Sequence, residues 1–231
     1  MKQDNKAGER MVLTIKDVKY AFRWCPAGTF MMGGDGDQHQ VTLTHGFWML
    51  ETEVTQKMWE DVMEKNMSNF KGDKLPVERV SWNDCHEYIT KLNDLGVAPK
   101  GYRFSLPTEA QWEYACRAGT TTAYYFGDTL TKEQANFDGN KTSEVGSYPA
   151  NTWGLYDMHG NVYEWCMDWY GDYPSGSVTD PTGAVAGSYR VLRGGDWDDV
   201  IEDCLSANRS FYHPSDRGHY LGLRVSLVCD E

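Results

Sequence analysis

The sequence lacks several features that would assign it to common classes of protein. Its 231 residues contain no run of 18 apolar residues, so no membrane-spanning helix is predicted. The six cysteines form no CxxC pair and no metal-like cluster, and we expect them to be buried free thiols. Basic residues are scarce, because 22 Lys and Arg stand against 34 Asp and Glu, a formal net charge of −12. Nucleic acid and anionic membranes are therefore not expected as partners, since both require a basic surface.

The composition nevertheless predicts a folded domain rich in turns. Hydrophobic residues make up 40% of the chain, and nine tryptophans and 23 glycines suggest aromatic anchors joined by tight turns. Residues 1–10, MKQDNKAGER, lack the apolar centre of a signal peptide and are interpreted as a hydrophilic tether. No linker composition or internal repeat follows, so residues 11–231 are predicted to form one α+β domain. Such a tether is typical of a chain whose export signal has been removed. It predicts a lipid-anchored protein at the cell surface. A cytoplasmic location is the alternative.

Local patterns predict both strands and helices. Short segments bounded by Gly and Pro predict strands at residues 11–15, 20–24, 30–34 and 41–50. Three segments combine helical periodicity with a capping residue: residues 53–66 with Thr55, residues 80–96 with Ser81, and residues 106–119 with Thr108. Thr108 lies three residues before Gln111, the spacing of a reciprocal capping box. No long helix is predicted beyond Gly119.

Five blocks of sequence, in order, carry a family resemblance. They are PVERVSWNDCHEYITKLN, YRFSLPTEAQWEYACRAG, NTWGLYDMHGNVYEWCMDWYG, YRVLRGGDW and CLSANRS. Together they resemble the formylglycine-generating-enzyme type of the C-type lectin fold over almost all of residues 26–228. The resemblance implies an α+β fold with small antiparallel sheets, two main helices and many loops. It leaves function open, because enzymes and binding proteins share the scaffold.

The best-known activity of the resembled family is copper-dependent oxidation of a substrate cysteine. In those enzymes two cysteines five residues apart hold copper(I), a geometry suited to a soft ion. The corresponding positions here are Asp199 and Cys204, so one ligand is a hard carboxylate. We therefore expect no copper cofactor and no enzyme activity. The alternative is an oxidase or another enzyme of the same superfamily, although the six histidines show no HxxxH pair for the iron-dependent branch.

Variable proteins of diversity-generating retroelements also resemble this chain. In them the C-terminal part of the fold is rewritten at template adenines, and a diversified Asn codon never yields Lys, Glu, Gln, Met or Trp. Here a C-terminal variable region at about residues 190–225 contains a frame set of fixed-looking residues: Arg193, Gly194, Gly195, Trp197, Cys204, Ser206, Ala207, Asn208, Arg209, Pro214, Arg217, Gly222 and Arg224. Sixteen residues interposed between them are candidates for diversification, and all but Glu202 are of reachable types. The other fifteen form a variable set of candidate ligand-binding residues: Asp196, Asp198, Asp199, Val200, Ile201, Asp203, Ser210, Phe211, Tyr212, His213, Ser215, Asp216, Gly218, His219 and Tyr220.

The variable set predicts a non-enzymatic protein that displays a diversified binding surface. Its rings and small polar residues are typical of antibody-like contact surfaces. The ligand is unknown, and a protein or another surface macromolecule is expected, bound by a monomer. The five rings Phe211, Tyr212, His213, His219 and Tyr220 should be exposed and close together. Four frame residues should be buried or constrained by their backbone: Trp197, Cys204, Ala207 and Gly222.

The stretch YDMHGNVYEW predicts a structural calcium site. Asp157 and Glu164 supply carboxylate oxygens, and the glycine turn can present the backbone carbonyls of Gly160 and Val162. The resembled enzymes carry a calcium on this stretch. The alternative is a folding turn in which Glu164 caps backbone amides.

Overall fold

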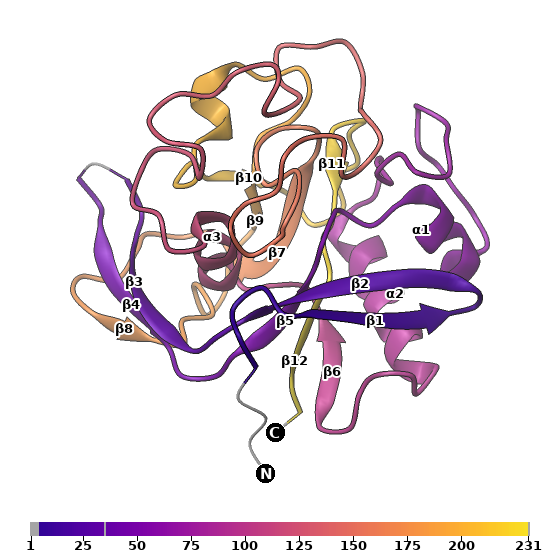
Figure 1. Cartoon of the computed structure of the whole chain (residues 1–231), viewed down its shortest axis with the longest axis horizontal. Helices are drawn as coiled ribbons and strands as arrows, with labels where there is room; N and C mark the ends of the chain where they lie inside the picture. The colour runs from indigo at the N-terminus through magenta and orange to yellow at the C-terminus, as the bar shows by residue number, and fades with distance from the viewer. Residues whose placement is uncertain (1–4, 35, 231) are drawn as a thin grey trace.

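The computed structural model describes residues 5–34 and 36–230, and they form one α+β domain built on three sheets (Figure 1). A five-stranded antiparallel sheet has the order β1-β2-β5-β12-β6. Its strands are β1 (Arg10–Ile15), β2 (Val18–Cys25), β5 (Phe47–Leu50), β12 (Ser226–Cys229) and β6 (Tyr102–Ser105). The C-terminal strand β12 therefore pairs between two strands from the first half of the chain.

Two smaller sheets complete the domain. One has the order β10-β9-β7-β11, with β7 (Tyr163–Trp169), β9 (Arg190–Arg193), β10 (Ser210–Tyr212) and β11 (Leu221–Gly222). The other has the order β3-β4-β8, with β3 (Gly28–Met32), β4 (His39–Leu43) and β8 (Val178–Thr179). The pairings of β11 with β7 and of β4 with β8 are parallel, whereas the expected sheets were antiparallel throughout.

Three α-helices begin at the predicted caps, one more than the two main helices that the resemblance implied. They are α1 (Gln56–Met63), α2 (Trp82–Asp94) and α3 (Glu109–Arg117). The Thr55 side chain accepts from the backbone of Met58, and Ser81 and Thr108 each form a reciprocal capping box. Helix α1 is shorter than predicted, because Glu64 adopts a left-handed conformation that ends it.

The predicted strand at residues 41–50 is two strands, β4 and β5, separated by a turn. Gly46 lies so close to the Trp24 ring that an added Cβ would come within 2.3 Å of it. The chain therefore turns at a residue without a side chain, and β5 continues into a different sheet. The other predicted strands are confirmed.

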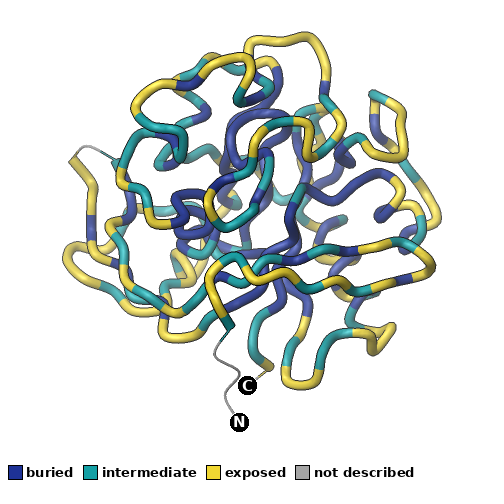
Figure 2. The backbone as a smooth tube through the Cα atoms, viewed as in Figure 1, coloured by how far each residue is buried: buried dark blue, intermediate teal, exposed yellow. Residues whose placement is uncertain are grey.

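The core forms two main clusters of buried side chains. The larger joins α1 and α2 to the five-stranded sheet, and the second surrounds α3. Backbone segments with buried residues run through the middle of the molecule (Figure 2). The short 3-10 helix η1 (Ile201–Cys204) and strands β10 and β11 lie in the upper half of Figure 1, away from the lower ends of β6 and β12. No described helix is both long and apolar enough to cross a membrane.

Candidate binding site

Burial separates the variable set from the frame set. Of the fifteen variable-set residues, seven are exposed and seven are half-buried, and only Asp196 is buried. Of the thirteen frame-set residues, eight are buried. Two of these, Arg193 and Arg224, are fully buried and joined to buried carboxylates, Glu113 and Glu164. The frame set therefore belongs to the folded interior, and the variable set faces solvent.

The loop of residues 213–220 is fastened to the start of α2. The carbonyl of Gly218 accepts from the backbone N–H of Arg79 at 2.9 Å, and that of Pro214 accepts from Asn83 at 3.1 Å. Arg217 donates two hydrogen bonds to the carboxylate of Asp84, at 2.8 and 2.9 Å. These contacts fasten the loop to α2 through frame residues or backbone groups, whereas the side chains of His213, Ser215 and Asp216 form hydrogen bonds within the loop.

Four of the five predicted rings form two groups rather than one patch, and the fifth, His213, contacts Ser215 instead. On one face of β10, the Tyr212 and Tyr220 hydroxyls are 3.1 Å apart, and His219 packs between Tyr220 and Trp197. Phe211 lies between Tyr170 and Tyr189, with ring centroids 4.3 and 5.1 Å away. The groups separate because neighbouring residues of a strand point to opposite faces.

Exposure of the five rings is uneven. Phe211, His213 and His219 are exposed as predicted, but Tyr212 and Tyr220 are half-buried and pack on the main core. Trp197, Cys204 and Gly222 are buried as predicted, whereas Ala207 is half-buried. The expectation of five freely exposed rings was therefore wrong for the two tyrosines that pair across β10 and the loop.

The two positions compared with copper ligands have different surroundings. The Asp199 carboxylate accepts from the backbone N–H of Asp196 at 3.1 Å, within a turn in which Asp196 accepts from Asp198 at 2.7 Å. Cys204 is fully buried against Gly195, and burial raises the pKa of its thiol well above the ordinary value. The thiol is therefore held protonated at neutral pH, unlike a metal-binding thiolate.

Glu164 does not provide free oxygens in the predicted calcium site. Arg224 donates to both of its carboxylate oxygens, at 2.7 to 3.0 Å, and the indole of Trp112 donates to one of them at 2.6 Å. All three side chains are buried. Glu164 therefore neutralises a buried guanidinium, and its oxygens are already in use.

The second candidate carboxylate beside Asp157 is Glu53, whereas the sequence had suggested Glu164. Glu53 and Asp157 are buried, and each has one oxygen, Oε2 and Oδ1, without a hydrogen bond partner among the described residues. Burial and the charge of Asp157 raise the pKa of Glu53, and burial raises that of Asp157 to about 6. Three buried carboxylates, counting Glu164, face one guanidinium in this region, so without a cation the raised pKa values of Glu53 and Asp157 favour their protonated forms.

The donors around Glu53 and Asp157 fit a hard divalent cation. Calcium prefers carboxylate and carbonyl oxygens, and the unpartnered Oε2 of Glu53 and Oδ1 of Asp157 are of this kind. The contribution of the Gly160 and Val162 carbonyls, which the sequence suggested as further ligands, stays a prediction. Within residues 5–34 and 36–230, no group of three or more His, Cys, Asp or Glu residues has metal-binding geometry. A cation here would therefore depend on backbone oxygens as well as on the two carboxylates. Sequence inspection missed Glu53 because it lies on a distant segment with no motif around it.

The fold and the site define a C-type lectin-like domain with an exposed C-terminal surface. The family model of the sulfatase-modifying factor enzyme 1-like domain (FGE-sulfatase) matches residues 19–228, so the chain belongs to that family. The fold assignment from sequence is confirmed.

Curated relatives in this family differ in kind. The chain is 32% identical over 209 residues to the formylglycine-generating enzyme of Mus musculus, covering 81% of this chain and 53% of that protein. It is 30% identical over 238 residues to the chaperone protein LppX of Paenibacillus barcinonensis, and the match covers 80% of this chain and 81% of that protein. It is 39% identical over 200 residues to the serine/threonine-protein kinase Pkn1 of Chlamydia trachomatis, covering 84% and 30%. The chain spans 24–30% of the length of the three kinase relatives.

Two solved structures superpose over nearly the whole domain. Treponema denticola variable protein 1 gives a TM-score of 0.89 at 30% identity, covering 96% of this chain and 99% of that one. PvdO from Pseudomonas aeruginosa gives a TM-score of 0.81 at 28% identity, and the match covers 97% of this chain and 99% of that one. The family thus contains proteins named as enzymes and a protein named as variable, and the scaffold alone does not separate them.

Proposed function

We propose that this domain is a non-enzymatic binding protein whose variable set forms a diversified ligand-contacting surface. The observation that carries the proposal is the division of residues 193–224 into a solvent-facing variable set and a largely buried frame set. Side chains that face solvent can be exchanged at little cost to stability, whereas buried ones cannot. Likeness to the treponemal variable protein over 96% of the chain supports the same function.

The chemistry at Asp199 and Cys204 argues against the oxidase alternative. A two-sulfur copper site needs two thiolates, and here one position is a turn-forming carboxylate and the other a buried, protonated thiol. Incubating the purified domain with copper(I) and a cysteine-containing peptide should therefore give no aldehyde. Aldehyde formation that is lost in Cys204→Ser would establish the enzyme instead.

A selection experiment tests the binding function directly. A yeast-displayed library randomised at Asp198, Val200, His213, Ser215 and His219 is sorted against hen lysozyme as the probe protein. A matched library randomises exposed residues outside the variable set, at Glu64, Lys65, Met67, Lys71 and Lys74. The variable-set library should yield lysozyme binders and the control library should not. Equal yields from both libraries would contradict a dedicated binding surface.

The proposal includes a structural cation, an extracellular location and a macromolecular partner. Calcium bound by Glu53, Asp157 and nearby backbone carbonyls would replace the protons that burial favours on these two carboxylates. A diversified surface is useful where it meets changing partners, which favours display of a monomer at the cell surface. The net charge of −12 favours a partner with a basic or neutral contact surface.

A further inference from the structure

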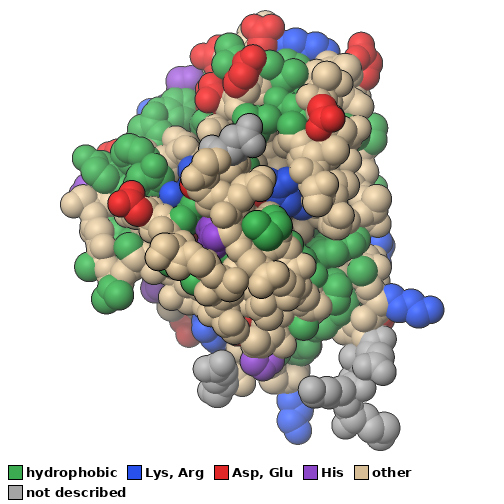
Figure 3. Space-filling view, turned by 90° about the vertical axis from the view of Figure 1, so that its left-hand side faces the viewer, with side chains coloured by type: hydrophobic (Ala, Val, Ile, Leu, Met, Phe, Trp, Pro, Cys, Tyr) green, Lys and Arg blue, Asp and Glu red, His purple; other side chains and the backbone are tan. Residues whose placement is uncertain are grey.

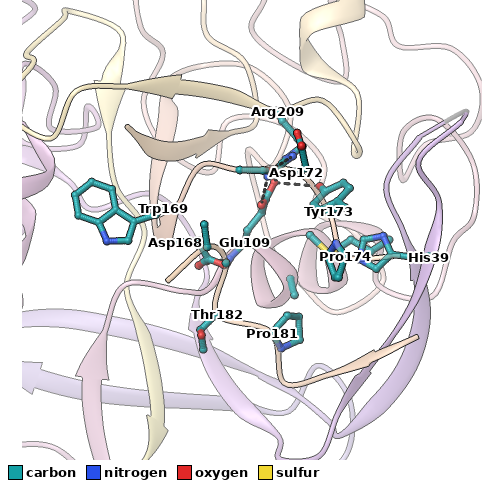
Figure 4. A pocket seen from close by; sticks show the side chains of 15 residues that line it. His39, Glu109, Asp168, Trp169, Asp172, Tyr173, Pro174, Pro181, Thr182 and Arg209 are labelled. Carbon is teal, nitrogen blue, oxygen red and sulfur yellow. Dashed lines mark hydrogen bonds and ion pairs between the residues drawn. The ribbon is translucent and has the colours of Figure 1, made fainter. Parts of the chain in front are cut away.

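A cavity outside the variable set lies between α3, the end of β7 and the loop of residues 171–184 (Figure 4). Its volume is about 230 Å³, and most of its wall is apolar, including Met32, Ala110, Pro174 and Pro181. A volume of this size fits a side chain or a very small molecule. The cavity lies on the side of the molecule that carries β3, β4 and β8, the side that faces the viewer in Figure 3.

One carboxylate at the wall of this cavity has a hydrogen bond donor for only one of its two oxygens. Asp168 is 2% exposed, and its Oδ2 accepts from the backbone N–H of Glu109, the first residue of α3, at 2.9 Å. No hydrogen bond from the described residues reaches its other oxygen, Oδ1, which lies on the side of Gly183, another residue of the wall. Oδ1 stays reachable from the cavity and has no donor within the described protein, so it can accept a hydrogen bond from a molecule that enters the cavity.

The other charges around the cavity leave a negative excess. Arg209 is neutralised by Glu109 through two hydrogen bonds of 2.6 and 2.9 Å, and the Tyr173 hydroxyl also donates to Glu109 (Figure 4). Asp172 lines the same cavity and forms no ion pair with the described residues. Asp168 and Asp172 are thus the carboxylates left for a ligand.

We propose that this cavity binds a primary ammonium group carried on a short apolar stem, with Asp168 as its anion. The apolar wall accommodates the stem, and Asp168 Oδ1 accepts a charge-assisted hydrogen bond from the ammonium. Free alkylamines and the lysine side chain of a partner protein share this chemistry. The cavity also adjoins the variable surface, because Phe211 packs on Tyr170, and Tyr170 and Arg209 line a neighbouring hollow.

The binding should strengthen as pH rises. Burial and the neighbouring charge of Glu109 raise the pKa of Asp168 to about 7, so the carboxyl is largely protonated below that pH. Other charged or titratable groups that face the cavity or Asp168 are Arg190 of β9, Arg209, Asp172 and His39. Loss of the pH dependence in Asp168→Asn separates Asp168 from these groups.

The test titrates the full chain at pH 8 with n-butylammonium, n-butanol and butyrate, followed by the NMR signal of the Trp169 indole N–H in the cavity wall. Only n-butylammonium should give a signal change that saturates. Asp168→Asn should weaken the affinity for n-butylammonium at least about tenfold, because a hydrogen bond to a charged group is lost. Asp94→Asn, at an exposed carboxylate outside both the cavity and the variable set, is the matched control and should bind as the parent does.

Further arms keep the proposal testable if Asp168→Asn does not fold. Ala184→Leu adds volume at the cavity wall beside Gly183 and Trp169 and should abolish n-butylammonium binding. Comparing n-butylammonium with a short peptide that contains one lysine distinguishes a free amine from a partner side chain. Equal binding of n-butanol, equal losses in Asp168→Asn and Asp94→Asn, or full binding by Ala184→Leu would each overturn the proposal.

Discussion

At the scale of single residues, the buried charges decide which side chains hold the fold and which remain for a ligand. Arg224 and Glu164 form a closed pair, whereas Glu53 and Asp157 each keep an unpartnered oxygen. A buried ion pair that loses one partner leaves an uncompensated charge, which is strongly destabilising. Two neighbouring carboxylates without a cation must instead hold protons. The two pairs therefore respond differently to calcium.

Calcium should stabilise the domain through Glu53 and Asp157. A hundredfold excess over its dissociation constant adds about 2.7 kcal/mol to the free energy of unfolding, and a chelator should lower the melting temperature accordingly. Glu53→Gln should abolish the calcium effect. Glu164→Gln should instead cost about 3–5 kcal/mol with or without calcium, because Arg224 stays buried without its anion. If calcium leaves the melting temperature of the parent chain unchanged, the domain does not bind calcium at this site.

Asp196 should make the stability depend on pH. Burial, then the charges of Asp199 and Asp198, raise its pKa to about 7, although backbone N–H groups oppose the shift. An unfolded Asp ionises near about 3.9, so the folded state holds this proton more tightly. The resulting stabilisation is fully present below about pH 4 and is lost as pH rises through about 7.

Asp196→Asn isolates this effect, because Asn keeps an acceptor for the N–H of Asp198. Urea unfolding at pH 5 and pH 8 should show that the variant loses less stability than the parent chain across this range. A stability difference between the two proteins that stays the same at both pH values would show that Asp196 does not titrate there.

Trp197 should be the costly residue within the variable region. Its ring is 7% exposed, packs against Phe70 and His219, and donates to the carbonyl of His219 at 3.2 Å. Trp197→Ala should therefore cost about 3–5 kcal/mol in urea unfolding. Phe211→Ser, at an exposed ring, should cost about 1 kcal/mol or less. Equal losses would mean that Phe211 is a core residue.

At the scale of secondary structure, the frame residues fix the binding loop to an element outside the variable region. Arg217 joins the loop to Asp84, and Asp84 also caps α2 through Ser81. Both side chains are partly exposed, so the ion pair contributes little to global stability. We therefore expect the ion pair to act locally, by keeping the loop of residues 213–220 ordered.

Arg217→Ala should change global stability by about 1 kcal/mol or less and speed amide hydrogen exchange in residues 213–220. Exchange within α2 should hardly change, because Ser81 and the backbone caps remain. Arg103→Ala, at an exposed ion pair with Asp230 on the opposite part of the molecule, is the control and should leave the loop unaffected. Unchanged loop exchange in Arg217→Ala would assign the anchoring to the backbone hydrogen bonds alone.

Local elements could be predicted from sequence, and non-local contacts could not. The caps at Thr55, Ser81 and Thr108 depend on residues three positions away, which sequence spacing displays directly. The position of β12 between β5 and β6 depends on pairing across the whole chain, and no local pattern specifies it. The same reason explains why Glu53 was missed beside Asp157, and why Glu164 was taken for a free ligand.

At the scale of the molecule, the domain combines a rigid interior with a surface that tolerates change. The frame set reaches into both main core clusters through Arg193 and Arg224, whereas the variable set lies at one side of the fold. The motif blocks located the family from sequence alone, and the variable region stays a prediction. They could not show that the rings would divide between two faces of β10, because this depends on strand register.

The measurement that tests this account most directly is the folded fraction of two displayed libraries. One randomises the fourteen variable-set residues that are not buried, and the other the eight buried frame-set residues, with folding scored by protease resistance on the yeast surface. Most members of the first library should resist protease like the parent chain, and most members of the second should be cleaved. If both libraries lose protease resistance to the same extent, the variable set is part of the core and the proposed binding surface does not exist.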